Sequence, residues 1–185
     1  MSASSTVWQG AGRRIHMQEV GLRDGLQMEK AFVPTEDKIA LCNALSSAGL
    51  SKIEVTSFTS PTAIPALKDA EIVMREITRR PGTVYSALVP NVRGAERAIE
   101  ARTDELNLVM SASETHNISN LRMTREQSFA SLAQVVATAQ AAQVAVNVSL
   151  SCVFGCPMEG NVHASAVFDW VQRFADLGVR GITLC

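Results

Sequence analysis

The chain has 185 residues, of which 46% are hydrophobic and 19% are charged, and its formal net charge is −1. This length is enough for one domain with a full core. A nearly neutral charge gives no bias toward nucleic acid or an anionic membrane surface. No apolar run approaches the ~20 residues of a spanning helix. We therefore expect a soluble globular protein without nucleic-acid or membrane partners.

Residues 1–14 are expected to form a flexible tail. The tail is rich in Ser, Ala and Gly, and it lacks the basic start and apolar core of a secretory signal. Without a targeting signal, we expect a cytoplasmic protein with reduced thiols rather than a disulfide framework. The four cysteines concerned are Cys42, Cys152, Cys156 and Cys185.

A short apolar strand followed by an amphipathic helix recurs along the chain. This alternation implies a parallel sheet with right-handed crossovers. Successive strand starts are separated by roughly 33 residues, close to the about 31 per unit of an eight-stranded (β/α) barrel. The strands are predicted to begin near Ile15, Lys52, Thr83, Asp104, Val144 and Arg180.

The predicted helices between these strands have recognisable starts and stops. A polar stretch at residues 111–117 is predicted to be a loop. We predict a helix capped by Thr35 and ended by Gly49, one from about Lys68 to Thr78, one starting near Asn91, one opened by a capping box at Thr124, and one ended by Gly178.

Two α/β architectures have this strand spacing. A doubly wound open sheet usually has a Gly-rich phosphate turn after its first strand, and neither GxGxxG nor GxxxxGK[ST] occurs here. We therefore predict the (β/α)8 TIM barrel. The chain ends on its sixth predicted strand, so the expectation for residues 15–185 is an incomplete, truncated catalytic barrel domain of about five βα units plus a sixth strand.

The segment Gly21–Gln27 follows the first predicted strand and places Arg23 beside Asp24. A carboxylate can hold a divalent metal, and a guanidinium can stabilise a developing oxyanion. Catalytic residues of a parallel barrel lie in the loops after the strands. The alternative for an isolated Arg-Asp-Gly is an ordinary surface turn with a local ion pair.

Other strand ends carry further candidates. Glu54 lies in an apolar strand, where an unpaired carboxylate is costly to bury, so a cation or metal-bound water is its expected partner. A structural arginine is the alternative. Cys152 and Cys156 are too isolated for a zinc motif, and the three histidines show no HxH or HExxH spacing.

Four segments, in this order, resemble the 3-hydroxy-3-methylglutaryl-CoA (HMG-CoA) lyases, which belong to a superfamily of metal-dependent barrels. The resemblance extends from about His16 to the last residue. Met28 departs from it, because the family commonly has asparagine there. The segments are Gly21–Gln27, Ile53–Phe58, Ser111–Glu114 and Gly155–Gly160.

The resemblance implies cleavage of HMG-CoA to acetyl-CoA and acetoacetate with Mg²⁺ or Mn²⁺, as in leucine degradation and ketone-body formation. It implies an acyl-CoA substrate and leaves a homodimer open for a full-length protein. Asp24 would be a metal ligand, and Arg23 and Glu54 would be catalytic. The expected substrate-binding residues are Arg23, Gln27, Ser57 and Asn120.

The same resemblance places two histidine ligands, an asparagine ligand and a loop cysteine after Cys185. The 185-residue chain alone is therefore expected to be largely inactive. Two alternatives remain at this level. One is an enzyme of the same superfamily that condenses an acyl-CoA with a 2-oxo acid. The other is a catalytically inactive half-barrel.

Overall fold

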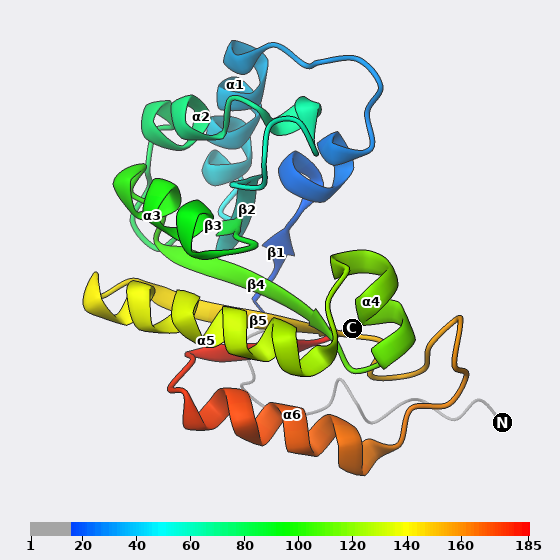
Figure 1. The fold of residues 1–185 in the computed structure, drawn as a ribbon. Coiled ribbons are helices and arrows are strands. Elements are labelled where there is room, and N and C mark those ends of the chain that lie inside the picture. Colours follow the sequence, from blue (N-terminus) through cyan, green and yellow to red (C-terminus); the bar gives the residue numbers. More distant parts are fainter. Residues whose placement is uncertain (1–15) are drawn as a thin grey trace, which may run out of the picture.

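The computed structural model describes residues 16–185, so the predicted tail at residues 1–14 lies outside the described part. All neighbouring strands are parallel, and their order in the sheet follows their order in the chain. The sheet curls into a half-barrel with helices outside it (Figure 1), as the α/β barrel prediction requires. The strands are β1 (Gln18–Glu19), β2 (Lys52–Ser57), β3 (Val84–Leu88), β4 (Glu105–Ser111), β5 (Ala145–Ser151) and β6 (Gly181–Leu184).

Six α-helices in the described part of the chain connect or follow these strands. Within residues 16–185, none of them is both long enough and apolar enough to cross a membrane. The helices are α1 (Thr35–Ser47), α2 (Ala70–Glu76), α3 (Val92–Glu100), α4 (Glu114–Leu121), α5 (Arg125–Ala141) and α6 (Ala164–Asp176), with a π-helical turn η2 (Gly21–Gly25) and a 3₁₀ turn η3 (Pro65–Leu67).

The start of α1 differs from the prediction by one residue. Pro34 is the N-cap, and Thr35 is the first helical residue. The Thr35 hydroxyl donates to Asp69 Oδ2 at 2.8 Å, so a tertiary partner replaces the expected local cap. The predicted stop is confirmed in type, because Gly49 follows the helix with φ +84°, a conformation that favours glycine.

The second helix is shorter than predicted. The chain forms η3 before it, and α2 begins at Ala70 rather than near Lys68. Its C-cap residue, Ile77, already has an extended backbone, with ψ 143°. The following turn is tied to Tyr85, whose hydroxyl accepts from Arg80 N at 2.9 Å, so tertiary hydrogen bonding ends the helix early.

Two predicted helix starts are confirmed. Asn91 accepts from Gly94 N as the N-cap of α3, and Thr124 forms a capping box with Gln127 at the start of α5. The loop prediction for residues 111–117 is wrong beyond its first residues, because α4 begins at Glu114. Ser113 caps that helix by accepting from His116 N.

The first strand is shorter than the apolar run that predicted it. Only Gln18–Glu19 pair with β2, and His16, expected within the strand, precedes it. Ile15 lies outside the described residues. The strand ends early because the backbone turns into η2 immediately after Val20, whose carbonyl accepts from Asp24 N at 2.7 Å.

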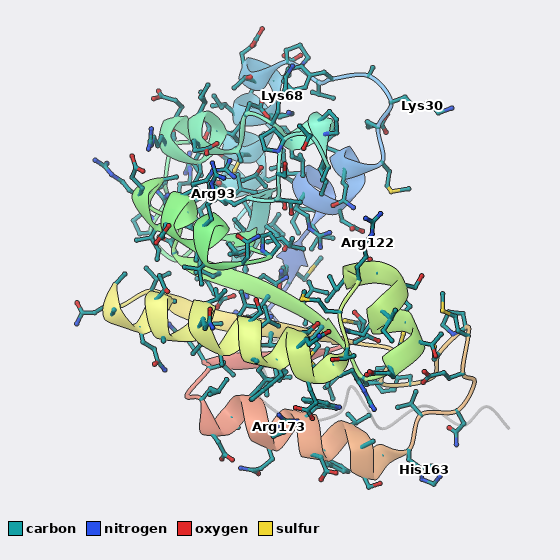
Figure 2. The ribbon with its side chains drawn as sticks, in the orientation of Figure 1. Lys30, Lys68, Arg93, Arg122, His163 and Arg173 are labelled. Carbon is teal, nitrogen blue, oxygen red and sulfur yellow. The ribbon has the colours of Figure 1, made fainter. Side chains whose placement is uncertain are left out.

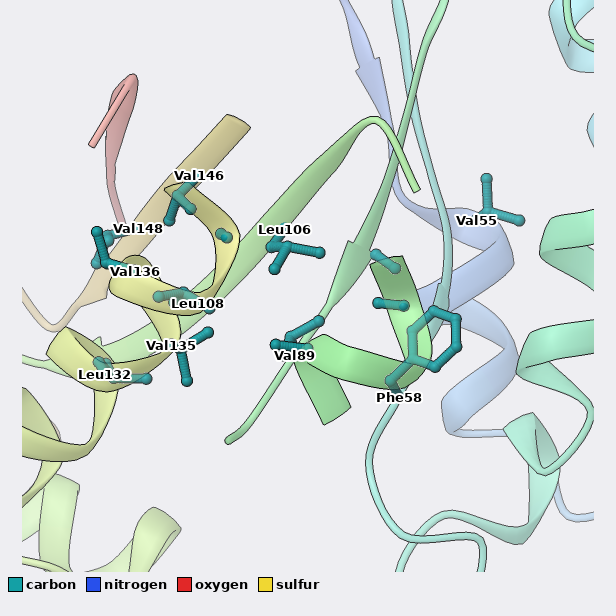
Figure 3. Packing of buried hydrophobic residues seen from close by; sticks show 14 of the residues in the cluster. Val55, Phe58, Val89, Leu106, Leu108, Leu132, Val135, Val136, Val146 and Val148 are labelled. Carbon is teal, nitrogen blue, oxygen red and sulfur yellow. The ribbon is translucent and has the colours of Figure 1, made fainter. Parts of the chain in front are cut away.

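The main core lies between the convex face of the sheet and the helices. Alternate residues of a strand point to opposite faces. Leu106 and Leu108 of β4 and Val146 and Val148 of β5 therefore pack against α5, and the residues between them face the concave interior of the half-barrel. Figure 3 shows this packing for Leu106 and Leu108 of β4, Val146 and Val148 of β5, and Leu132, Val135 and Val136 of α5.

Candidate active site at the carboxyl ends of the strands

The turn η2 is anchored at its start. Gly21 N donates to Glu19 Oε1 at 2.6 Å, and Leu22 is buried in the core. A Cβ at residue 21 would lie 2.9 Å from that Glu19 oxygen. π-Helical turns are rare and occur frequently at functional sites. The anchored turn therefore presents Arg23 and Asp24 in a defined position beyond the end of β1.

The Arg23 guanidinium lies between two carboxylates. Its Nη1 is 2.6 Å from Asp24 Oδ1, and its Nη2 is 3.1 Å from Glu54 Oε2. The Arg23 side chain is only 15% exposed, whereas that of Asp24 is 61% exposed. Because Asp24 keeps most of its carboxylate accessible, it can bind a further ligand while it orients Arg23.

Glu54 is buried behind Arg23 on the concave side of β2, with 1% of its surface exposed. The apolar neighbours Ile53 and Val55 belong to the core on the other face. Glu54 Oε2 accepts from Arg23, and Oε1 accepts from Asn107 Nδ2 at 3.0 Å. The cation that balances this buried carboxylate is thus the arginine of the turn itself.

A chain of polar side chains continues from Glu54 across the sheet. Asn107 Oδ1 accepts from Asn147 Nδ2 at 2.9 Å and from Ser149 Oγ at 3.0 Å. Asn147 Nδ2 also donates to Thr183 Oγ1 at 3.1 Å. The sequence reasoning missed this network. The available signal was the polar residues at alternate positions of β5, with Asn107 interrupting an otherwise largely apolar β4.

A cavity of about 520 Å³ opens beside these residues. Its wall includes Arg23, Asp24, Gln27 and Asn120, which are four of the six site residues predicted from the sequence. Gln27 lies two residues after η2, and Asn120 is near the end of α4. The fold therefore brings together side chains from distant parts of the sequence, since Arg23 and Asn120 are 97 positions apart.

Ser57 and Glu54 do not line this cavity. Glu54 touches it only through Arg23. Ser57 is buried at the end of β2, and its Oγ is 2.7 Å from Thr59 Oγ1. Thr59 is on the cavity wall, so on this segment Thr59, and not Ser57, borders the cavity.

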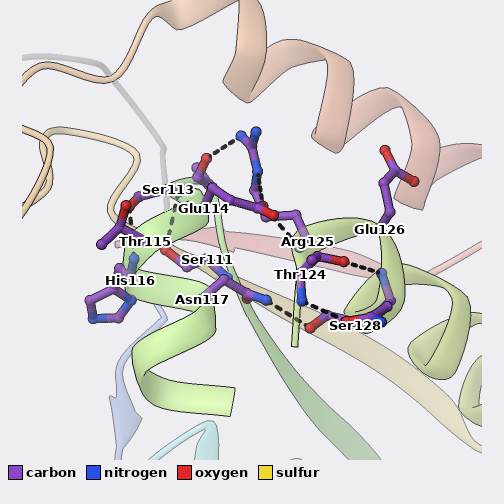
Figure 4. Close-up of polar contacts among 12 residues, drawn as sticks. Ser111, Ser113, Glu114, Thr115, His116, Asn117, Thr124, Arg125, Glu126 and Ser128 are labelled. Carbon is purple, nitrogen blue, oxygen red and sulfur yellow. Dashed lines mark hydrogen bonds and ion pairs between the residues drawn. The ribbon is translucent and has the colours of Figure 1, made fainter. Parts of the chain in front are cut away.

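Helix α4 holds Asn120 against the cavity through buried polar contacts at its base (Figure 4). Asn117 Nδ2 donates to Ser128 Oγ at 2.8 Å, and its Oδ1 accepts from Ser111 N at 3.0 Å. Glu114 Oε2 accepts from Arg125 Nε at 2.8 Å. These contacts fix α4 to the end of β4 and the start of α5.

The loop after β5 is also attached to the start of α4. Glu159 Oε1 accepts from Thr115 N at 2.6 Å, and Cys156 Sγ lies 3.0 Å from Ser113 Oγ. Burial acts to raise the pKa of the Cys156 thiol, but hydrogen bonds from Ser113 and from the backbone of the loop outweigh it and lower that pKa.

The histidines do not form a metal centre within residues 16–185. His16 precedes β1, His116 is in α4, and His163 points away from the body of the chain at the start of α6 (Figure 2). No group of three or more His, Cys, Asp or Glu side chains that could hold a metal is found in this range. Asp24 is the carboxylate that lines the cavity.

Comparison with known proteins agrees with this geometry. The model of the HMGL-like family matches residues 14–185. The chain belongs to the HMGL-like family. This HMGL-like chain is 44% identical over 172 residues to hydroxymethylglutaryl-CoA lyase YngG of Bacillus subtilis, covering 93% of the chain and 58% of that protein.

Solved structures give the same result. An HMG-CoA lyase of Acinetobacter baumannii, in complex with coenzyme A and 3-methylmalate, is 49% identical with a TM-score of 0.85, covering 90% of this chain and 54% of that one. The B. subtilis HMG-CoA lyase is 44% identical with a TM-score of 0.89, covering 92% and 57%. The HMGL-like chain thus spans little more than half the length of these relatives.

Proposed function

We propose that the protein to which this chain belongs cleaves HMG-CoA to acetyl-CoA and acetoacetate with Mg²⁺ or Mn²⁺. The observation that carries the proposal is the Arg23 guanidinium, held at a cavity wall between Asp24 and Glu54. The relatives named as HMG-CoA lyases support the same reaction. Residues 15–185 would form the N-terminal part of the catalytic barrel.

Asp24 fits the expected metal. Its carboxylate is 61% exposed on the cavity wall, and hard cations such as Mg²⁺ and Mn²⁺ prefer oxygen ligands. The remaining ligands would come from outside residues 16–185, since this range supplies no group of three candidate side chains. When bound, a divalent cation supplies Lewis-acid polarisation of substrate oxygen atoms.

Arg23 would stabilise the negative charge that develops during cleavage. When the C2–C3 bond of HMG-CoA breaks, its electron pair moves toward the thioester, whose oxygen becomes enolate-like. A guanidinium has five N–H donors, and the two carboxylates use one each. The Nε–H is buried, so the second N–H of each Nη remains to bind that oxygen, and a fixed donor does not need to reorganise during the reaction.

Glu54 would orient Arg23 and act as the catalytic carboxylate close to the metal. The cleavage also needs a base that removes the proton from the tertiary hydroxyl. Gln27 and Asn120 would contact the substrate, because both line the cavity. The proposed contact of Ser57 with the substrate would run through Thr59, to which its hydroxyl is hydrogen-bonded.

An acyl-CoA substrate is supported by the coenzyme A in the A. baumannii relative. For the full-length protein we further propose a homodimer, a cytoplasmic location, a place in leucine degradation and ketone-body formation, and no nucleic-acid or membrane partner. The relatives include both mitochondrial and cytoplasmic lyases, so cell fractionation tests the location. Sedimentation analysis of the full-length protein tests the dimer.

The full-length protein should be assayed with HMG-CoA, and with acetyl-CoA plus a 2-oxo acid. We expect metal-dependent release of acetoacetate, loss of that release in EDTA, its recovery with Mg²⁺ or Mn²⁺, and no condensation. Condensation without cleavage would instead establish the acyl-CoA/2-oxo acid alternative.

Arg23→Lys tests the residue that carries the proposal. Lysine keeps the charge but cannot contact Asp24 and Glu54 in the same planar geometry. We expect kcat to fall by about 10²-fold or more, the usual effect of losing an oxyanion donor. Arg93→Lys, on α3 and away from the cavity wall, is the control and should retain activity. An active Arg23→Lys enzyme would contradict the proposed role.

A further inference from the structure

We infer that Asn107 and Asn147 are positioning residues that hold Glu54, and through Glu54 also Arg23, in place for the reaction. The two asparagines face each other in the register of β4 and β5. Asn107 donates to Glu54, and Asn147 donates to Asn107. The effect on catalysis rests on the proposed lyase function, whereas the network of hydrogen bonds among these side chains does not.

The direction of these hydrogen bonds follows from the chemistry of Glu54, the carboxylate at which they end. A carboxylate accepts hydrogen bonds and does not donate them, so Asn107 must turn its Nδ2 toward Glu54. Its Oδ1 then faces β5 and needs donors. Asn147 Nδ2 and Ser149 Oγ supply them at 2.9 and 3.0 Å. The buried carboxylate thus sets the orientation of both amides.

The position of these amides is unusual for the inside of a parallel barrel, where branched apolar side chains usually pack. Asn107 is 4% exposed and Asn147 is 7% exposed. Polar groups at this burial are costly unless they are hydrogen-bonded. Gly181 makes room for them, because a Cβ there would lie 2.8 Å from Asn147 Oδ1.

The hydrogen-bonded network also reaches the cavity at a second residue. Ser149 lines the cavity wall and donates to Asn107 Oδ1. The cavity is therefore bounded by Arg23 at one end of the network and by Ser149 at another. A substrate that contacts either residue acts on the same set of hydrogen bonds.

Removing Asn107 has a defined consequence. Glu54 Oε1 would lose its only partner among the described residues and would be left unsatisfied in a buried position. The carboxylate would then be free to rotate away from Arg23, and the guanidinium would lose one of the two anchors that aim it. The loss should appear in the chemical step rather than in substrate affinity.

The first experiment compares Asn107→Leu with Ser86→Ala in the full-length protein. Ser86 is also buried and lies beside Glu54 in the sheet register, but its hydroxyl donates to Ile53 O and not to the network. We expect Asn107→Leu to lower kcat by about tenfold or more with little change in KM. Ser86→Ala should lower thermal stability without this loss. Equal kcat in the two variants would overturn the inference.

The second experiment does not depend on activity. In ¹⁵N spectra of the full-length protein, the side-chain amides of Asn107 and Asn147 should be protected from exchange with water. Glu54→Gln should shift the Asn107 signal and, through it, the Asn147 signal. If Glu54→Gln leaves both signals in place, the inference fails even when the enzyme cleaves HMG-CoA. If the signals move in Glu54→Gln but the wild-type protein does not cleave HMG-CoA, the proposed function fails and the hydrogen-bonded network stands.

Gly181→Ala covers the case in which Asn107→Leu does not fold. The added methyl group removes no polar atom, but it would displace Asn147 Oδ1. We expect the Asn147 amide signal to lose protection and kcat to fall. Normal kcat together with a displaced Asn147 signal would overturn the positioning role.

Discussion

Arg23 is held between carboxylates that come from different parts of the chain. Asp24 is adjacent in sequence, and an Arg–Asp pair of this kind fits a surface turn as well as a catalytic site. Glu54 lies 31 positions later, and its burial removes the ambiguity. The sequence placed both residues at strand ends, but only the structure shows that they form one site.

Cys42 illustrates the opposite case, a reactive group kept inactive by its position. The thiol is buried in the core, and burial raises its pKa to about 11. We predict that Cys42 in the folded protein does not react with a thiol reagent at pH 8, because the thiolate is the nucleophile. The exposed Cys185 should react quickly.

Counting the modified thiols over time with 5,5′-dithiobis(2-nitrobenzoate) checks this. Cys185→Ser is the control and should remove the fast phase. Denaturant should expose Cys42. Rapid labelling of Cys42 under native conditions would show that the inner face of α1 is not buried as the structure describes.

At the scale of elements, the sequence was reliable where hydrogen bonds are local. The capping box of α5 and the N-cap of α3 were found because donor and acceptor are three residues apart. It failed where a distant partner decides. Asp69 changed the start of α1. The helix α4 was missed although its N-cap, Ser113, is local, and the contacts of Asn117 then fix this helix to β4 and α5.

The capping box predicts the effect of Thr124→Ala. Thr124 Oγ1 accepts from Gln127 N, and the Gln127 side chain accepts from Thr124 N. The substitution should lower the free energy of unfolding by about 1 kcal/mol, a typical value for an N-cap. Urea denaturation measures this. Gln134→Ala, at an exposed position near the middle of the same helix, should have a much smaller effect, and equal losses would contradict the prediction.

The loop after β5 predicts a dependence on pH. The hydrogen bonds from Thr115 hold the pKa of the Glu159 carboxyl below its usual value. A lowered pKa in the folded state adds stability above the unfolded pKa, about 4.3, and this stability is lost as pH falls through the folded pKa. The Glu159 contribution should therefore be present at pH 7 and vanish in acid.

Thermal unfolding of the wild type and Glu159→Gln from pH 7 to pH 3 tests this. The wild type should have the higher Tm at pH 7, and the two values should converge as pH falls. The exposed Glu96→Gln on α3 serves as the control. A constant difference in Tm between the wild type and Glu159→Gln would rule out the carboxylate as the source.

For the whole molecule, we predict that the 185-residue chain by itself releases negligible acetoacetate and binds Mn²⁺ weakly. Within residues 16–185, Asp24 is the carboxylate on the cavity wall, and no group of three potential ligands is present. An assay of acetoacetate and electron paramagnetic resonance of free Mn²⁺ measure the two properties. Rapid metal-dependent release by this chain would contradict the prediction.

The sequence by itself determined the order of the strands and of the helices other than α4, the barrel-type sheet and the residues at the carboxyl ends of the strands. These features follow from hydrophobic period, helix caps and the geometry of parallel βα units, all of which are local. Only the tertiary structure decided which polar side chains meet. Asn107 and Asn147 are 40 positions apart and become partners because β4 and β5 pair in one register. Burial then makes their hydrogen bonds obligatory. These bonds link the candidate catalytic pair, Arg23 and Glu54, to β4, β5 and β6 along the concave face of the sheet.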